Sequence, residues 1–180
     1  MFVFAFPGMG KTTFAKKYIN VVDLELSDIK YDNSSISHLS KEERKATKRP
    51  IKDKYYKKTY IKKAFEFQAS GKIVLVALNF VVRLLFHMLL QGKVDFHIFV
   101  PHPSLKDEYK QRYKKRGNNP KFIFEVLMVW YPTLIPLYLL SKWLPQYITV
   151  TSAGETLEMA YSRASFNHLK NRYHLSFPRK

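Results

Sequence analysis

Residues 2–13 read FVFAFPGMGKTT, and the rest of the chain is interpreted from them. An apolar run of β-forming residues ends in a glycine turn, and a helix-forming segment, residues 14–19, follows. This order matches the phosphate-binding pattern G-x-x-x-x-G-K-[ST], with Ala5 in place of the first glycine. The pattern predicts that a nucleoside triphosphate binds here. An ordinary glycine turn between a strand and a helix is the alternative.

Each residue type in this loop has a chemical reason to be there. Gly8 and Gly10 allow the backbone to bend so that its N–H groups point at phosphate oxygens, and the following helix begins with its positive dipole end. Lys11 is expected to reach the β- and γ-phosphates, and the Thr12 hydroxyl to bind Mg²⁺. The residues predicted to bind ATP are Pro7, Gly8, Met9, Gly10, Lys11, Thr12 and Thr13.

Two acidic residues follow in the next apolar run. Residues 21–26 (VVDLEL) predict a second strand, and strand, helix and strand in succession predict a parallel sheet. Ligands of such sheets bind beyond the carboxyl ends of the strands, and alternation along a strand would point Asp23 and Glu25 to the same side. We predict that Asp23 helps to hold Mg²⁺ and that Glu25 orients an acceptor. Solvated carboxylates, or carboxylates paired with cations, are the alternative.

The composition is that of a globular protein with an excess of positive charge. The chain has 180 residues, of which 46% are hydrophobic and 25% charged, and this suits a single folded domain. Lys and Arg number 31 against 14 Asp and Glu, a formal net charge of +17, which favours nucleotides, nucleic acid or an acidic membrane surface as partners. Without cysteine or a basic leader, the chain is predicted to be cytoplasmic.

Residues 41–70 form the most basic segment. Between residues 41 and 63, eleven Lys or Arg residues stand against three acids. Pro50 is expected to open a helix on the acceptor side of the site, with Tyr56 and Tyr60 interleaved among the lysines of its outer face. Basic and aromatic residues together can follow a polynucleotide backbone, although a charged helix face is more often simply solvated.

A second charged helix is expected over residues 105–116, within a segment that spans residues 104–118. Arg112 and Arg116 lie four residues apart and therefore on one helical face. Two guanidinium groups on one face can stabilise a transferring phosphoryl group through bidentate hydrogen bonds. We predict that both arginines are catalytic; a solvated basic helix paired with the acids of its first turn is the alternative.

Residues 122–140 are unusually apolar, with Glu125 as their single charge. Their length and composition meet the usual criterion for a membrane span, but Pro132 and Pro136 interrupt the segment. We therefore expect a helix over residues 121–131, packed on the sheet, and a kinked second segment to residue 140. A membrane-bound or partner-bound face is the alternative.

With these elements placed, the chain resembles small phosphate-loop kinases of the nucleoside monophosphate kinase type, and more narrowly the adenylate-kinase-like proteins of bacteriophages. The resemblance rests on four stretches, residues 4–13 (FAFPGMGKTT), 21–28 (VVDLELSD), 72–79 (KIVLVALN) and 99–118 (FVPHPSLKDEYKQRYKKRGN). It implies a three-layer α/β fold around a central, mainly parallel sheet of five strands. It also implies that the helix with both arginines belongs to a lid that closes over ATP.

The sequence thus predicts a cytoplasmic kinase that uses ATP and Mg²⁺ and transfers the γ-phosphoryl group to a nucleotide-like acceptor, first of all a nucleoside monophosphate. The residues predicted to be catalytic are Lys11, Glu25, Arg112 and Arg116, and those predicted to bind the metal are Thr12 and Asp23. One alternative is a polynucleotide 5′-hydroxyl kinase, favoured by the basic segment 41–63. The other is a nucleotide-gated ATPase that binds a membrane or partner through residues 122–140. The acceptor, the base preference and the oligomeric state stay open.

Overall fold

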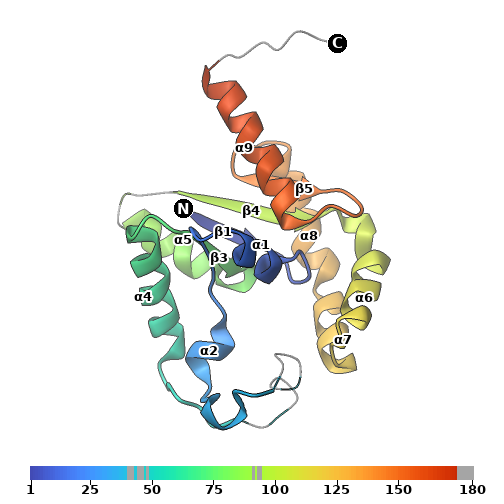
Figure 1. Cartoon of the computed structure of the whole chain (residues 1–180). Helices are drawn as coiled ribbons and strands as arrows, with labels where there is room; N and C mark the ends of the chain where they lie inside the picture. Colours follow the sequence, from blue (N-terminus) through green and yellow to red (C-terminus); the bar gives the residue numbers. More distant parts are fainter. Residues whose placement is uncertain (40–42, 44–46, 48, 91, 93–94, 174–180) are drawn as a thin grey trace.

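Five parallel strands form one sheet in the middle of the molecule, in the order β2-β3-β1-β4-β5 (Figure 1). The computed structural model describes residues 1–39, 43, 47, 49–90, 92 and 95–173. The strands are β1 (Phe2–Ala5), β2 (Val21–Asp23), β3 (Ile73–Ala77), β4 (Phe96–Pro101) and β5 (Ile148–Thr151). All four residues of β1 are buried because this central strand is covered on both faces. The predicted α/β class and parallel five-stranded sheet are confirmed.

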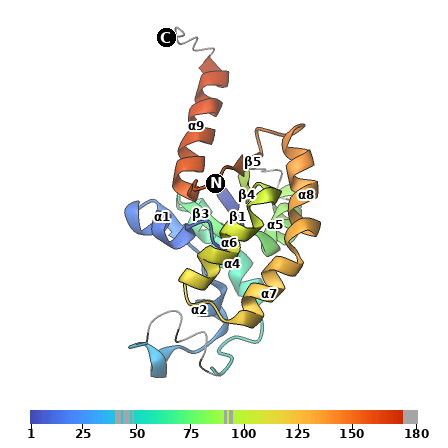
Figure 2. The ribbon, with the colours of Figure 1, turned by 90° about the vertical axis from the view of Figure 1, so that its right-hand side faces the viewer.

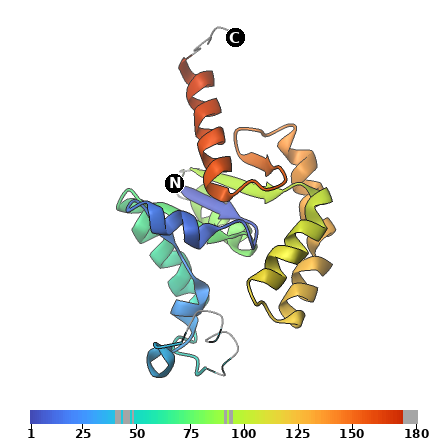
Figure 3. The same ribbon diagram turned by 45° about the vertical axis from the view of Figure 1, so that its right-hand side comes forward.

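Helices cover the two faces of the sheet (Figures 1 and 3). On one face, Phe99 of β4 packs on Tyr161, with ring centroids 6.2 Å apart. On the other face, Phe2 of β1 meets Phe65 edge-on at 5.2 Å. The first layer consists of α1 (Lys11–Lys17) and α9 (Leu157–Tyr173), and the second of α4 (Tyr56–Ala69), α5 (Val81–Leu90) and α8 (Trp130–Ser141). The sheet is thus the middle of three layers.

Two further helices extend beyond the carboxyl end of β4 and pack against each other (Figure 2). They are α6 (Lys106–Lys115) and α7 (Pro120–Met128). The shorter elements are α2 (Leu26–Lys30) and the 3-10 turns η1 (Ser34–Ile36), η2 (Leu78–Phe80) and η3 (Pro103–Leu105). Because β1 and β4 are neighbours, α6 lies beside the loop that leaves β1.

The basic segment begins its helix later than predicted. Pro50 does not open a helix: its carbonyl accepts a hydrogen bond from the N–H of Asp32 (3.0 Å), within a short pairing of the two chain segments. The carboxylate of Asp53 accepts from the N–H of Tyr55 (2.6 Å), and α4 starts directly after it. The part of the prediction that falls on residues 41–42, 44–46 and 48 lies outside the described residues.

The apolar segment folds as a pair of helices, as predicted, with a bend of 43° between α7 and α8. The first helix ends at Met128 rather than at residue 131, and it packs on α6 and α8, so the prediction that it packs on the sheet is wrong; α8 makes that contact. Among the helices that the structure describes, no single one has both the length and the hydropathy of a membrane span. The bent pair meets the criterion only when its two helices are counted together.

Candidate functional site

The glycine loop, residues 6–10, connects β1 to α1 at the carboxyl edge of the sheet. Gly8 and Gly10 have φ angles of +89° and +94°, which are rarely adopted by other residues. A Cβ atom on Gly8 would lie only 2.8 Å from Cε1 of Tyr113, whereas one on Gly10 would meet nothing within 4 Å. Gly10 is therefore required for its backbone conformation alone, and Gly8 also for the close approach of α6.

Hydrogen bonds from α6 and α9 fix the carbonyl groups of the loop. The hydroxyl of Tyr113 donates to the carbonyl of Pro7 (2.8 Å), and the N–H of Leu157 donates to the carbonyl of Met9 (2.9 Å). Among the residues that the structure describes, no acceptor is found for the N–H groups of the two loop glycines. A loop whose carbonyls are bonded to neighbouring helices and whose glycine N–H groups are available is suited to an anion.

Tyr109 and Tyr113 attach α6 to this loop, and sequence reasoning missed both. Each has only 1% of its surface exposed, and each ring lies close to Gly8. Burial raises the pKa of Tyr109 to about 12 and also raises the pKa of Tyr113. The available signal was their spacing of four residues, which places two aromatic rings on one side of a strongly charged helix.

A pocket of about 770 Å³ lies between the glycine loop, α6 and the first turns of α9. It is bordered by Gly8, Gly10 and Thr13, by Arg112, Lys115 and Arg116, and by Thr156, Glu158 and Met159, among others. The structure thus brings both predicted arginines and the predicted phosphate-binding glycines to one pocket. The surplus of cations around it favours an anionic ligand.

The guanidinium group of Arg112 is held in place by its neighbours on α6. One of its nitrogens lies 2.6 Å from the carboxylate of Glu108, and the group stacks over the ring of Tyr109, 4.8 Å from its centroid. The same carboxylate accepts a hydrogen bond (3.2 Å) from the N–H of Gly154, in the turn after β5. The pairing with an acid of the first helical turn, which the alternative interpretation gave, is present for Arg112, and the arginine still borders the pocket.

Thr12 and Asp23, the two predicted metal ligands, lie side by side. The Thr12 hydroxyl, in the first turn of α1, donates to the carboxylate of Asp23 at the end of β2 (2.6 Å). The ammonium group of Lys11 lies 3.4 Å from the carbonyl oxygen of Ala5, at the start of the same loop. A hydroxyl and a carboxylate are ligands that suit Mg²⁺.

The part of the chain that the structure describes offers few ligands for a metal beyond this pair. Within residues 1–39, 49–90 and 95–173, no group of three or more His, Asp or Glu side chains could hold a metal ion. This fits a Mg²⁺ ion that binds through one or two protein groups together with substrate phosphates and water. It does not fit a metal site built from protein side chains alone.

The prediction that Glu25 lies on the second strand is wrong. The strand ends at Asp23, and Glu25 is the residue directly before α2. The hydroxyl of Tyr60, on α4, donates to the carbonyl of Leu24 (3.0 Å), so this carbonyl has a partner outside the sheet directly after the strand ends. Burial raises the pKa of Tyr60, and the nearby carboxylates of Asp23 and Glu25 raise it further. Both carboxylates therefore lie near the hydroxyl of Tyr60, although Glu25 is outside the strand.

The prediction that Tyr60 lies on the outer face of the basic helix is also wrong. The side chain of Tyr60 is fully buried and stacks on Phe80 at 4.3 Å, so it does not interleave with the lysines. Tyr56 is half-buried, with the ammonium group of Lys30 lying 4.9 Å from its ring centroid. Four lysines of α4 are exposed, namely Lys57, Lys58, Lys62 and Lys63.

Hydrogen bonds at one end of the pocket join α1 to α9. The carboxylate of Glu158 accepts from the ammonium group of Lys17 (2.6 Å) and from the hydroxyl of Tyr18 (2.9 Å). These hydrogen bonds lower the pKa of Glu158 and raise that of Lys17. The link keeps the first turns of α9 beside the glycine loop.

The sequence matches no model of a known protein family, and no curated protein is significantly similar to it. The functional interpretation therefore depends on the geometry of the site.

Proposed function

We propose that the protein is a cytoplasmic, ATP-dependent phosphotransferase whose acceptor is a nucleotide, in the first place a nucleoside monophosphate. One observation carries the proposal: the glycine loop and the guanidinium groups of Arg112 and Arg116 border one pocket, at the carboxyl edge of a parallel sheet. Ligands of such sheets bind at this edge. A positively charged pocket against a glycine loop suits a polyphosphate.

Each group then has a separate task in phosphoryl transfer. The loop N–H groups and the ammonium group of Lys11 bind the triphosphate, and the two arginines stabilise the charge that develops on the transferring group. Thr12 and Asp23 would hold Mg²⁺, which neutralises charge on the β- and γ-phosphate oxygens when bound. Glu25, which like Asp23 lies near the hydroxyl of Tyr60, orients the acceptor.

A polynucleotide 5′-hydroxyl kinase is the second candidate, and the basic side of α2 and α4 favours it. The guanidinium group of Arg49 stacks over Tyr31 at 4.4 Å, and Lys30 lies over Tyr56. Cations interleaved with aromatic rings can hold single-stranded nucleic acid. Phosphorylation of 5′-hydroxyl oligonucleotides, with binding that weakens steeply as salt is added, would select this candidate.

The test is transfer of label from γ-labelled ATP to each nucleoside monophosphate and to 5′-hydroxyl oligonucleotides. Lys11→Ala is expected to lower turnover by about 10²–10³, the usual cost of removing one electrostatic donor from a transition state. Lys16→Ala, an exposed lysine of the same helix, is the matched control and is expected to keep its turnover. Equal turnover in the Lys11→Ala variant and the wild-type protein would contradict the proposal.

A further inference from the structure

Helix α8 is apolar around its whole circumference, yet only one side of it is covered. Trp130 and Leu134 are fully buried, while Ile135, Leu139 and Leu140 are 44%, 51% and 45% exposed. A helix with apolar residues on all sides is normally covered on all sides, in a protein core or in lipid. The outer side of α8 is therefore a surface that fits an apolar partner.

This surface continues onto α7 and past the end of α8. Exposed side chains on it, here called the apolar face, are Phe124, Met128, Val129, Tyr131, Ile135, Leu139, Leu140, Trp143 and Leu144. Trp143 is the most exposed of them, at 83%. From residue 119 to residue 144 the sequence contains one acid, Glu125. Exposed apolar side chains in this number, on two consecutive helices, favour an interaction site.

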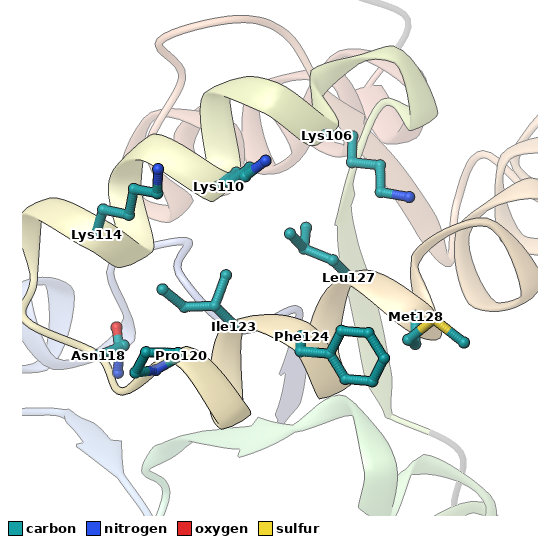
Figure 4. Close-up of a pocket in the computed structure, with 9 residues that line it drawn as sticks. All are labelled: Lys106, Lys110, Lys114, Asn118, Pro120, Ile123, Phe124, Leu127 and Met128. Atoms are coloured by element: carbon teal, nitrogen blue, oxygen red, sulfur yellow. The ribbon is translucent and has the colours of Figure 1, made fainter.

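A row of lysines borders the apolar face. Lys106, Lys110 and Lys114 are spaced four residues apart along α6 and line a groove of about 590 Å³ between α6 and α7. Figure 4 shows the three lysines on one wall of the groove, with Ile123 and Leu127 of α7 on the other. The ammonium group of Lys106 also lies 4.5 Å from the ring centroid of Tyr131, so the row and the apolar face adjoin.

We propose that the apolar face and the lysine row together bind the surface of an anionic lipid bilayer. Apolar side chains enter the boundary between headgroups and acyl chains, while lysines beside them contact lipid phosphates. An exposed tryptophan next to a lysine, as at Trp143 and Lys142, is suited to the interface between water and lipid. The protein binds the bilayer from one side, and α7 and α8 lie along it.

Charge favours lipid over a second copy of this chain. The formal net charge is +17, and a symmetric dimer through this face would bring two lysine rows toward each other. An anionic bilayer instead attracts both the lysine row and the protein as a whole. The proposal does not depend on the phosphotransferase activity, because lipid binding is measured without nucleotide.

Sedimentation with vesicles tests the proposal, using vesicles of phosphatidylcholine alone and vesicles mixed with phosphatidylserine. We expect binding to the mixed vesicles that weakens with salt, and little binding to phosphatidylcholine alone. The double variant Lys110→Ala/Lys114→Ala is expected to bind about 30-fold more weakly, since each lysine near an anionic surface contributes about fivefold. Lys62→Ala/Lys63→Ala on α4 removes the same charge elsewhere and is expected to have a much smaller effect.

A second pair of variants tests the apolar face. Ile135→Ser/Leu139→Ser is expected to reduce vesicle binding by about tenfold or more, because it removes apolar side chains that enter the bilayer. Leu89→Ser/Leu90→Ser is the control, since these leucines are 67% and 70% exposed but lie on α5, away from α6 and α7 (Figure 1). Thermal unfolding by circular dichroism shows whether each variant is folded before its binding is compared.

Quenching of tryptophan fluorescence by lipid reports contact with the bilayer directly and does not change when a variant only loses stability. The chain has two tryptophans, of which Trp130 is fully buried. Brominated lipids should quench the wild-type protein, and Trp143→Phe should remove the quenching while binding is largely kept. Three results would overturn the proposal: no binding to anionic vesicles, binding that Lys110→Ala/Lys114→Ala leaves unchanged, or a dimer in ultracentrifugation that Ile135→Ser/Leu139→Ser dissociates.

Discussion

Helix α6 has two basic sides that face different surroundings. Its arginine side, with Arg112, Lys115 and Arg116, borders the pocket against the glycine loop. Its lysine side, with Lys106, Lys110 and Lys114, borders a groove against apolar residues of α7. Each side carries three cations, so charge alone does not distinguish them. The surface opposite each side distinguishes them. The arginine side faces the backbone N–H groups of the glycine loop, which suit a phosphate chain, whereas the lysine side lies beside exposed apolar side chains, which suit lipid.

The tyrosines between the two sides give the largest predicted effect. Tyr113→Ala removes a buried ring from the contact between α6 and the loop and is expected to lower the free energy of unfolding by about 3–5 kcal/mol. Tyr113→Phe keeps the ring and loses only the hydrogen bond to Pro7, so a cost of about 0.5–1.5 kcal/mol is expected. Urea unfolding followed by circular dichroism measures both. Similar values for the two variants would contradict this account of the contact.

Removing one cation from each side of α6 in turn sharpens the comparison between the two sides. Arg116→Ala is expected to lower phosphotransfer by about 10²–10³ and to change vesicle binding little. Lys110→Ala is expected to do the reverse, with vesicle binding reduced by about fivefold and turnover changed far less. Both quantities are measured on the same preparations. If each variant lowered both quantities equally, the two sides would have no separate functions.

A smaller effect is expected at alkaline pH. Burial raises the pKa of Tyr109 to about 12 and also raises the pKa values of Tyr60 and Tyr113. Burial therefore favours the neutral form of these three tyrosines in the folded protein. The neutral side chains contribute fully to the free energy of unfolding below pH about 10, where an exposed tyrosine ionises. The contribution is lost as the pH rises above that value. Absorbance of tyrosinate should show at least these three of the 12 tyrosines ionising late, together with unfolding. Ionisation of all of them near pH 10, before unfolding, would contradict the observed burial.

The glycine loop and the Thr12–Asp23 contact could be predicted because short-range order determines them. A strand, a glycine turn and a helix fix where Thr12 points, and the next parallel strand brings Asp23 to the same edge. The arginine pair followed from helical spacing, and it too lies beside the loop. Its catalytic role stays a prediction.

The remaining features depend on contacts between distant parts of the chain. The hydrogen bond from Tyr113 to Pro7 joins residues 106 positions apart, and no local pattern indicates it. The hydroxyl of Tyr60, 36 positions further along the chain, binds the carbonyl of Leu24 directly after the second strand, and local alternation gave no sign that the strand ends before Glu25. Composition showed that residues 122–140 are apolar, but only packing shows which side of α8 is covered.

The central claim is that the glycine loop binds a polyphosphate, and a crystal structure with Mg²⁺ and a non-hydrolysable ATP analogue tests it most directly. The account predicts the triphosphate against the N–H groups of Gly8 and Gly10, with Lys11 on its outer phosphates and Arg112 and Arg116 within reach of them. An analogue bound elsewhere, with the loop free at saturating concentration, would contradict the account.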